Sequence, residues 1–185
     1  PHRDTRLVRK LDSGNYLVCH EGDGRVREYR PILSSNNSAT GFQIAKPEVV
    51  WDYEVPMFGR EAKNGHGVDA FGNQCFCALR LARGNTLIST GNGHSIIEVT
   101  KTKEIVWKLE QNDLPGIQLA WVTTLQQLPS GNIVIGNCHA GASNPQIIEV
   151  NRDKQVIWSF RDFERFGNAT TNTQVLTVDG KKIAL

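Results

Sequence analysis

The sequence has little of what marks membrane, nucleic-acid-binding and metal-binding proteins. No stretch of its 185 residues approaches the roughly 18 consecutive apolar residues of a membrane-spanning helix, so we expect no membrane span. Lysine and arginine outnumber aspartate and glutamate by only 21 to 19 and are scattered, so we expect no nucleic-acid partner. Its histidines and cysteines show neither His-x-x-x-His nor Cys-x-x-Cys spacing, so the sequence predicts no metal site.

What the sequence does contain is one pattern repeated three times. Each copy opens with a Leu-x-x-Gly-Asn segment, continues with a Glu, which lies between apolar neighbours in the second and third copies, and ends with a Trp after a β-branched pair. The second and third opening glycines are 47 residues apart, which is close to the period of about 40–50 residues in β-propeller blades. The copies comprise Leu11–Asn15, Glu28 and Trp51; Leu81–Asn85, Glu98 and Trp107; and Leu128–Asn132, Glu149 and Trp158.

The second copy shows how each unit divides into strands. Alternating and short apolar runs predict strands over 76–81, 86–89, 95–99 and 104–109. The Gly-Asn pair supplies the positive φ that a tight hairpin needs between the first two strands. Only Phe163 to Phe166 has the pattern of a helical turn, so we predict an all-β chain.

We therefore predict β-propeller-type repeats: three four-stranded antiparallel blades and a half blade, in a single partial β-propeller domain spanning 1–185. The polar stretch Ser34–Gly41 is expected to be an enlarged loop in the first repeat. Propellers usually close with four to eight blades, so we expect further blades from sequence outside this chain or from another chain. The predicted repeats are 6–55, 74–110 and 122–160, with the half blade at 173–185.

The run Ile148–Trp158 resembles the outer-strand tryptophan-docking motif of quinoprotein (PQQ-like) propellers. The Leu-x-x-Gly-Asn hairpins resemble those of bacterial arylsulfotransferase-like secreted propellers. This resemblance implies a propeller of WD40/YVTN-like architecture located in the periplasm or outside the cell. The chain departs from the quinoprotein pattern, because Lys101-Thr102 and Arg152-Asp153 replace its Thr-Gly and its adjacent cysteine pair is missing. We therefore expect no quinone and no other cofactor.

The four cysteines are predicted to be buried free thiols. Cys75 and Cys77 alternate on one predicted strand, so both side chains point to the same face. A bridge between Cys19 and Cys138 would have to span two blades, although disulfides need Cα atoms about 4–7 Å apart.

All five histidines are predicted to lie at one end of the molecule. In a four-stranded blade, the turn between the second and third strands and the connection to the next blade open on the same end. Loops on a rigid scaffold are frequent sites of function, so this end is the candidate binding face. Its predicted ligand-binding residues are His2, Asp4, His20, His66, Asp69, His94, Trp121 and His139.

Residues just before the first strands are predicted to line the central channel. Gly65-His66-Gly67-Val68-Asp69 stands out, because the glycines allow a ligand to approach the backbone closely. The alternative is that these histidines only make local hydrogen bonds, and that Trp121 packs in the core. The predicted channel residues are His2, Arg3, Asp4, His66, Asp69, Gln118, Trp121 and Asn172.

Three functions fit this pattern. The leading one is a noncatalytic ligand- or protein-binding module of a larger secreted propeller, whose partner is an unknown small molecule, glycan or protein. The second is an enzyme of arylsulfotransferase or quinoprotein type with active groups at the channel mouth, for which the sequence assigns no catalytic residue. The third is a carbohydrate-binding module in which a sugar stacks on Trp121.

Overall fold

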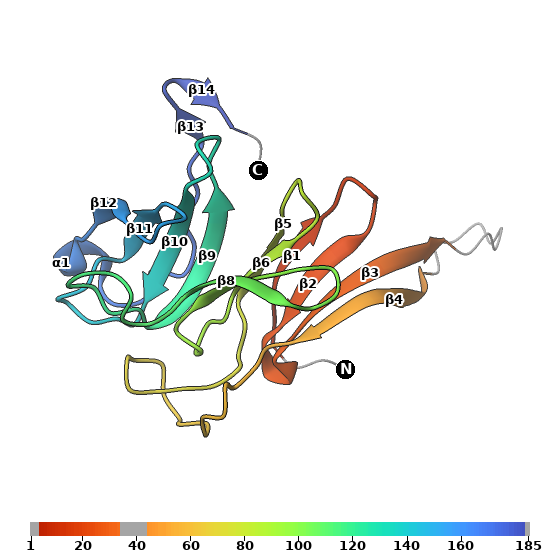
Figure 1. Ribbon diagram of the computed structural model, residues 1–185, viewed down its shortest axis with the longest axis horizontal. Helices are drawn as coiled ribbons and strands as arrows, with labels where there is room; N and C mark the ends of the chain where they lie inside the picture. Colours follow the sequence, from red (N-terminus) through yellow and green to blue (C-terminus); the bar gives the residue numbers. More distant parts are fainter. Residues whose placement is uncertain (1–3, 34–43, 184–185) are drawn as a thin grey trace.

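The computed structural model describes residues 4–33 and 44–183, and within them it forms three four-stranded antiparallel sheets. In each sheet the strands follow chain order from one edge to the other, so every connection is a hairpin (Figure 1). The three sheets confirm the predicted propeller-type blades. They contain β1 (Thr5–Lys10), β2 (Tyr16–His20), β3 (Arg25–Leu33) and β4 (Ile44–Glu54); β5 (Cys77–Arg80), β6 (Thr86–Ser89), β7 (Ile96–Val99) and β8 (Ile105–Leu109); and β9 (Trp121–Gln127), β10 (Ile133–Cys138), β11 (Ile147–Val150) and β12 (Val156–Phe160).

One structural feature explains why Gly-Asn and Glu recur in every repeat: a tight hairpin that is hydrogen-bonded to the third strand. In the second sheet Gly84 adopts a φ of 93° in the hairpin between β5 and β6, which a residue with a side chain adopts rarely. The next residue, Asn85, donates from Nδ2 to Glu98 Oε1 over 2.6 Å. The same bond joins the asparagine and glutamate of the other two sheets, at 2.6 Å and 2.7 Å. The hairpin is thereby tied to the third strand in every blade.

The repeated tryptophans connect neighbouring blades. Trp51 Nε1 donates to Lys101 O over 3.1 Å, and Trp107 Nε1 donates to Arg152 O over 2.9 Å. Both acceptors lie in the turn between the third and fourth strands of the following sheet. Each tryptophan is paired across the strand with the glutamate of its own repeat, so the register is the same in all three sheets.

The core lies between the sheets, as expected for blades that stack side by side. One cluster joins the second and third sheets and includes Leu87, Leu125 and Ile135, all fully buried. A second cluster joins the first and second sheets and includes Val26 and Ile88. The innermost strands β1, β5 and β9 are neighbours through these contacts.

Shorter elements complete the chain. A 3₁₀ turn at Glu21–Asp23 joins β2 to β3, and α1 (Phe163–Phe166) confirms the single helical turn predicted from the sequence. The predicted half blade is a small hairpin of β13 (Thr177–Val178) and β14 (Lys181–Lys182). Within 4–33 and 44–183, no helix has the length and apolar character to cross a membrane. The predicted loop Ser34–Gly41 lies outside the described residues.

All four cysteines are buried and unbridged, as predicted. Cys19 and Cys75 lie in the core between the first two sheets, and Cys77 lies in the core between the second and third. The prediction that the Cys75 and Cys77 side chains point to the same face is therefore wrong, because β5 begins at Cys77 and Cys75 precedes it in the connection. Burial raises the pKa of both Cys19 and Cys77, so these thiols stay protonated at neutral pH.

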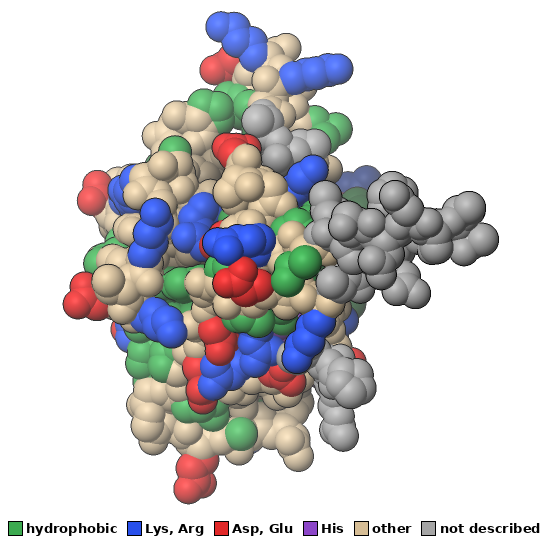
Figure 2. Space-filling view, turned by 90° about the vertical axis from the view of Figure 1, so that its right-hand side faces the viewer, with side chains coloured by type: hydrophobic (Ala, Val, Ile, Leu, Met, Phe, Trp, Pro, Cys, Tyr) green, Lys and Arg blue, Asp and Glu red, His purple; other side chains and the backbone are tan. Residues whose placement is uncertain are grey.

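The side of the molecule at the first sheet carries interleaved charges of both signs (Figure 2). The paired strands β3 and β4 place basic residues opposite acidic ones: Arg25 Nη1 is 2.7 Å from Asp52 Oδ2, and Arg30 Nη1 is 2.9 Å from Glu48 Oε2. The basic residues of this side are therefore largely offset by neighbouring carboxylates.

Candidate functional site

A long connection brings one predicted histidine to the third sheet. Residues 55–76 link β4 to β5 and loop out below the sheets in Figure 1. His66 lies in this connection, with its ring centroid 4.6 Å from that of Trp121 and 5.1 Å from that of His139. Three segments far apart in the sequence thus meet at one aromatic cluster, which we call the His66 cluster.

The strand register of the third sheet positions the other two rings. Trp121 begins β9 and pairs with Cys138, the last residue of β10, so His139 follows directly beside it. His139 takes a left-handed φ of 61°, and its backbone N–H donates to Asn168 O over 2.6 Å. These contacts fix where the His139 ring points.

Exposure differs sharply within the cluster. Trp121 is only 6% exposed, His139 is half-buried, and His66 is exposed. His66 is therefore the ring of the cluster most exposed to solvent, while Trp121 lies beneath it in the protein interior. A sugar could stack on the Trp121 ring only if His66 moved away, so the geometry does not favour the carbohydrate-binding alternative.

A pocket of about 300 Å³ opens beside the cluster. It is lined by His139, Ala140 and Gly141 and by residues 63–65 and 67–70 of the connection, including the predicted site residue Asp69. Gly65 and Gly67 lie in its wall, so backbone groups are open to a ligand there. This volume is at the lower end of the range for small-molecule sites.

The electrostatics keep His139 neutral. Burial lowers its pKa, and repulsion by a charged His66 lowers it further. Cys138 Sγ lies 2.9 Å from His139 Nδ1, and burial raises the pKa of this thiol to about 11. A protonated thiol can donate to Nδ1, which favours the tautomer with its proton on Nε2.

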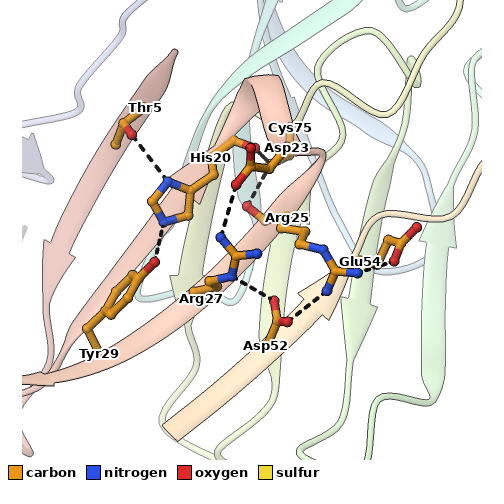
Figure 3. A network of polar contacts seen from close by, with 9 residues as sticks. All are labelled: Thr5, His20, Asp23, Arg25, Arg27, Tyr29, Asp52, Glu54 and Cys75. Carbon is orange, nitrogen blue, oxygen red and sulfur yellow. Dashed lines mark hydrogen bonds and ion pairs between the residues drawn. The ribbon is translucent and has the colours of Figure 1, made fainter. Parts of the chain in front are cut away.

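His20 lies apart from the cluster. It is 4% exposed, with Nδ1 3.2 Å from Thr5 Oγ1 and Nε2 2.8 Å from the Tyr29 hydroxyl (Figure 3). Next to it, Arg25 and Arg27 share the Asp52 carboxylate. Both ring nitrogens of His20 face protein partners, so its role in the structure is to join β1, β2 and β3.

His94 is also buried away from solvent. It is 0% exposed, its Nε2 is 2.5 Å from Ala70 O, and its ring packs edge-on against Phe71. It holds the connection from β4 to β5 against the second sheet. It therefore supports the loop that carries His66 without itself facing a ligand.

The eight predicted site residues thus do not form one cluster. Asp4 is exposed at the start of the first sheet, where its backbone O accepts a hydrogen bond from Glu21 N. His2 and Arg3 lie outside the described residues. Of the predicted channel residues, the Gln118 backbone N–H donates to Asn144, and Asn172 lines a pocket at the other end of β9.

Sequence analysis missed residues that shape the site. Cys138 contacts the His139 ring, and its position next to His139 in the sequence could have indicated this contact. Asn168 holds two parts of the loop through its O and Oδ1 atoms, which accept from His139 N and Gly141 N. Nothing in the pattern of the sequence indicates this role.

Comparison with known proteins establishes the fold. No protein-family model and no curated protein matches the sequence. The chain resembles a solved structure of a protein of unknown function from Bacteroides caccae, at 23% identity and a TM-score of 0.63, over 89% of this chain and 52% of that one. It also resembles a streptogramin B lyase (10% identity, TM-score 0.52, 89% and 42% covered) and a virginiamycin B lyase from Staphylococcus aureus (9%, 0.53, 92% and 45%).

The chain has a β-propeller-type fold. It spans about half the length of the structures that it matches. At these identities the similarity establishes the arrangement of the strands and leaves the activity open.

Proposed function

We propose that this chain is a noncatalytic binding module whose His66 cluster and adjoining pocket accept a small ligand or a segment of a partner protein. The observation that carries this proposal is the convergence of His66, Trp121 and His139 from three separate segments beside a pocket. Rigid strands hold two of the rings, and an exposed loop supplies the third. This combination is typical of ligand sites on propeller and other loop-bearing scaffolds.

The pocket favours a ligand with both polar and aromatic character. Lys63 and Asp69 give it one charge of each sign, and the glycines expose backbone donors and acceptors. A neutral His139 offers a ligand the Nε2–H donor of the favoured tautomer, because its Nδ1 already accepts from Cys138. A flat heteroaromatic group could contact the exposed His66 ring and hydrogen-bond to the pocket wall.

A screen of polar heteroaromatic fragments by ligand-observed NMR tests the proposal. We expect fragments that bind the wild type to lose binding in His66→Ala. The matched control is Tyr16→Ala, which removes another exposed ring at the opposite end of the molecule. Fragments that bind the His66→Ala protein and the wild type equally would refute this location, and the absence of any hit would count against a small ligand.

A second candidate function is an enzyme of lyase or arylsulfotransferase type. The observation that favours it is the exposed imidazole of His66, whose ring centroid lies 5.1 Å from that of a second imidazole, since imidazole is the commonest proton-transfer group in enzymes. The test is incubation with virginiamycin B and with an aryl sulfate, followed by mass spectrometry. Turnover that is abolished in His139→Ala while melting is unchanged would support the enzyme; no turnover of either compound would favour the binding module.

We further propose that the module belongs to a larger propeller in the periplasm or outside the cell. This rests on the resemblance of its hairpins to those of secreted bacterial propellers. Cell fractionation followed by immunoblotting of the native protein tests it. Recovery of the protein in the cytoplasmic fraction would contradict it.

A further inference from the structure

A separate pocket lies at the other end of the innermost strands. It has a volume of about 380 Å³ and is lined by β1, β5, β9 and residues 172–174. Trp121 begins β9 and Gln126 lies near its end, so about 15–20 Å separate this pocket from the His66 cluster. We call it the inner-strand pocket.

The inner-strand pocket is positively charged. Arg9 and Arg80 line it, and among its described lining residues none is acidic. Arg9 Nη2 donates to a backbone carbonyl, Leu125 O, over 2.9 Å, which leaves its charge without a carboxylate. Arg80 Nη2 donates to Glu28 Oε2 over 2.7 Å, so Arg80 has a carboxylate partner outside the pocket lining.

The same pocket contains unused hydrogen-bonding capacity. Within the described chain, Arg9 Nε, Arg80 Nε and Thr173 Oγ1 are buried and have no hydrogen-bond partner. Burying a donor without an acceptor is unfavourable, and more so when the donor is charged, so such groups in a folded protein call for an explanation. Three of them on the wall of one pocket point to an absent acceptor.

We propose that the inner-strand pocket binds a small oxyanion, a carboxylate or a phosphate group. Two guanidinium groups supply charge and forked donors that match the oxygens of such an anion. The Arg9 and Arg80 side chains would rotate to bring their Nε–H groups to its oxygens, and the Thr173 hydroxyl would add a neutral donor. This site is independent of the His66 cluster and of the function proposed for it.

Isothermal titration calorimetry with inorganic phosphate and with succinate, in dilute phosphate-free buffer, tests this site. We expect at least one of the two anions to bind the wild type. A preference for phosphate assigns a phosphorylated ligand, and a preference for succinate assigns a carboxylate. Arg9→Gln and Arg80→Gln should each weaken binding about tenfold or more, because each removes a charged donor.

Arg165→Gln is the matched control, since Arg165 is 80% exposed, paired with Asp162, and remote from the pocket. It should bind the anion as tightly as the wild type. Failure of both anions to bind, or equal affinity in Arg9→Gln, would overturn the proposal. If circular dichroism shows that the variants are unfolded, amide NMR shifts of the wild type decide: shifts at Thr173 and Asn172 on adding the anion support the site, and shifts confined to other residues overturn it.

Discussion

Replacing Glu98 with alanine should destabilise the fold more than the equivalent change in the third sheet. Glu98 is fully buried, and its carboxylate accepts from Asn85 Nδ2 at 2.6 Å and from Arg83 Nη2 at 2.7 Å. Arg152 Nη1 of the next sheet lies 2.6 Å from its other oxygen. Because Arg152 also supplies the backbone oxygen for Trp107, Glu98 lies at the junction between two blades.

The expected loss of stability in Glu98→Ala follows from the charged groups that lose their partner. Removing one member of a buried ion pair costs about 3–5 kcal/mol. Arg83 is 60% exposed and can turn to water, whereas Arg152 is 29% exposed and remains partly desolvated, so we expect about 3 kcal/mol. Glu149, the matched control, accepts a single such bond from Asn132, so Glu149→Ala should cost about 1 kcal/mol.

Urea unfolding followed by circular dichroism measures both free energies of unfolding. A cost for Glu98→Ala no larger than that for Glu149→Ala would refute the role given to the inter-blade pair. The pH dependence provides a second check. Burial acts to raise the pKa of Glu98, but bonds from Asn85, Arg83 and Arg152 outweigh it and hold the pKa below its ordinary value of 4.5.

A carboxylate with a lowered pKa in the folded state stabilises the fold above its unfolded pKa and loses that contribution as it becomes protonated. The wild type should therefore lose stability as the pH falls below about 4.5, towards the lowered pKa of the folded state. In Glu98→Ala the free energy of unfolding should change less with pH over the same range, because this carboxylate is missing.

Three further substitutions test the packing between blades by thermal unfolding. Trp107→Phe should cost about 1 kcal/mol because it removes the bond to Arg152 O, whereas Trp158→Phe, on a ring 51% exposed, should change stability by less than about 0.5 kcal/mol. Gly91→Ala should cost at least about 2 kcal/mol, because a Cβ there would lie 1.9 Å from Gln74 O at a φ of 54°; an unchanged melting temperature would contradict the close approach.

Much of the fold could be predicted because the repeat encodes its own register. The predicted strand 86–89 is β6 itself, β7 and β8 each begin one residue later than predicted, and β5 is one residue shorter at each end than the predicted strand 76–81. Each repeat places Gly, Asn and Glu at positions fixed by hairpin φ and one side-chain bond, and in the first two repeats an inter-blade bond also fixes the Trp. Local sequence therefore determines most of the architecture.

The candidate site was less predictable, because it depends on where a long connection folds. The sequence predicted His66 on the candidate binding face but could not show that its loop crosses to the third sheet. His20 and His94 share the same sequence context yet are buried with their own partners. Exposure of a loop histidine depends on tertiary contacts that a repeat pattern does not contain.

The most direct test of the central claim, that three distant segments form the His66 cluster, is proton NMR titration of the His139 ring. Burial and the charge of His66 both lower the pKa of His139, so the wild type should titrate below 6.5. In His66→Ala the repulsion is gone and the ring is better hydrated, so the midpoint should move up towards 6.5. A midpoint identical in the two proteins would show that the two imidazoles do not meet and would contradict the account.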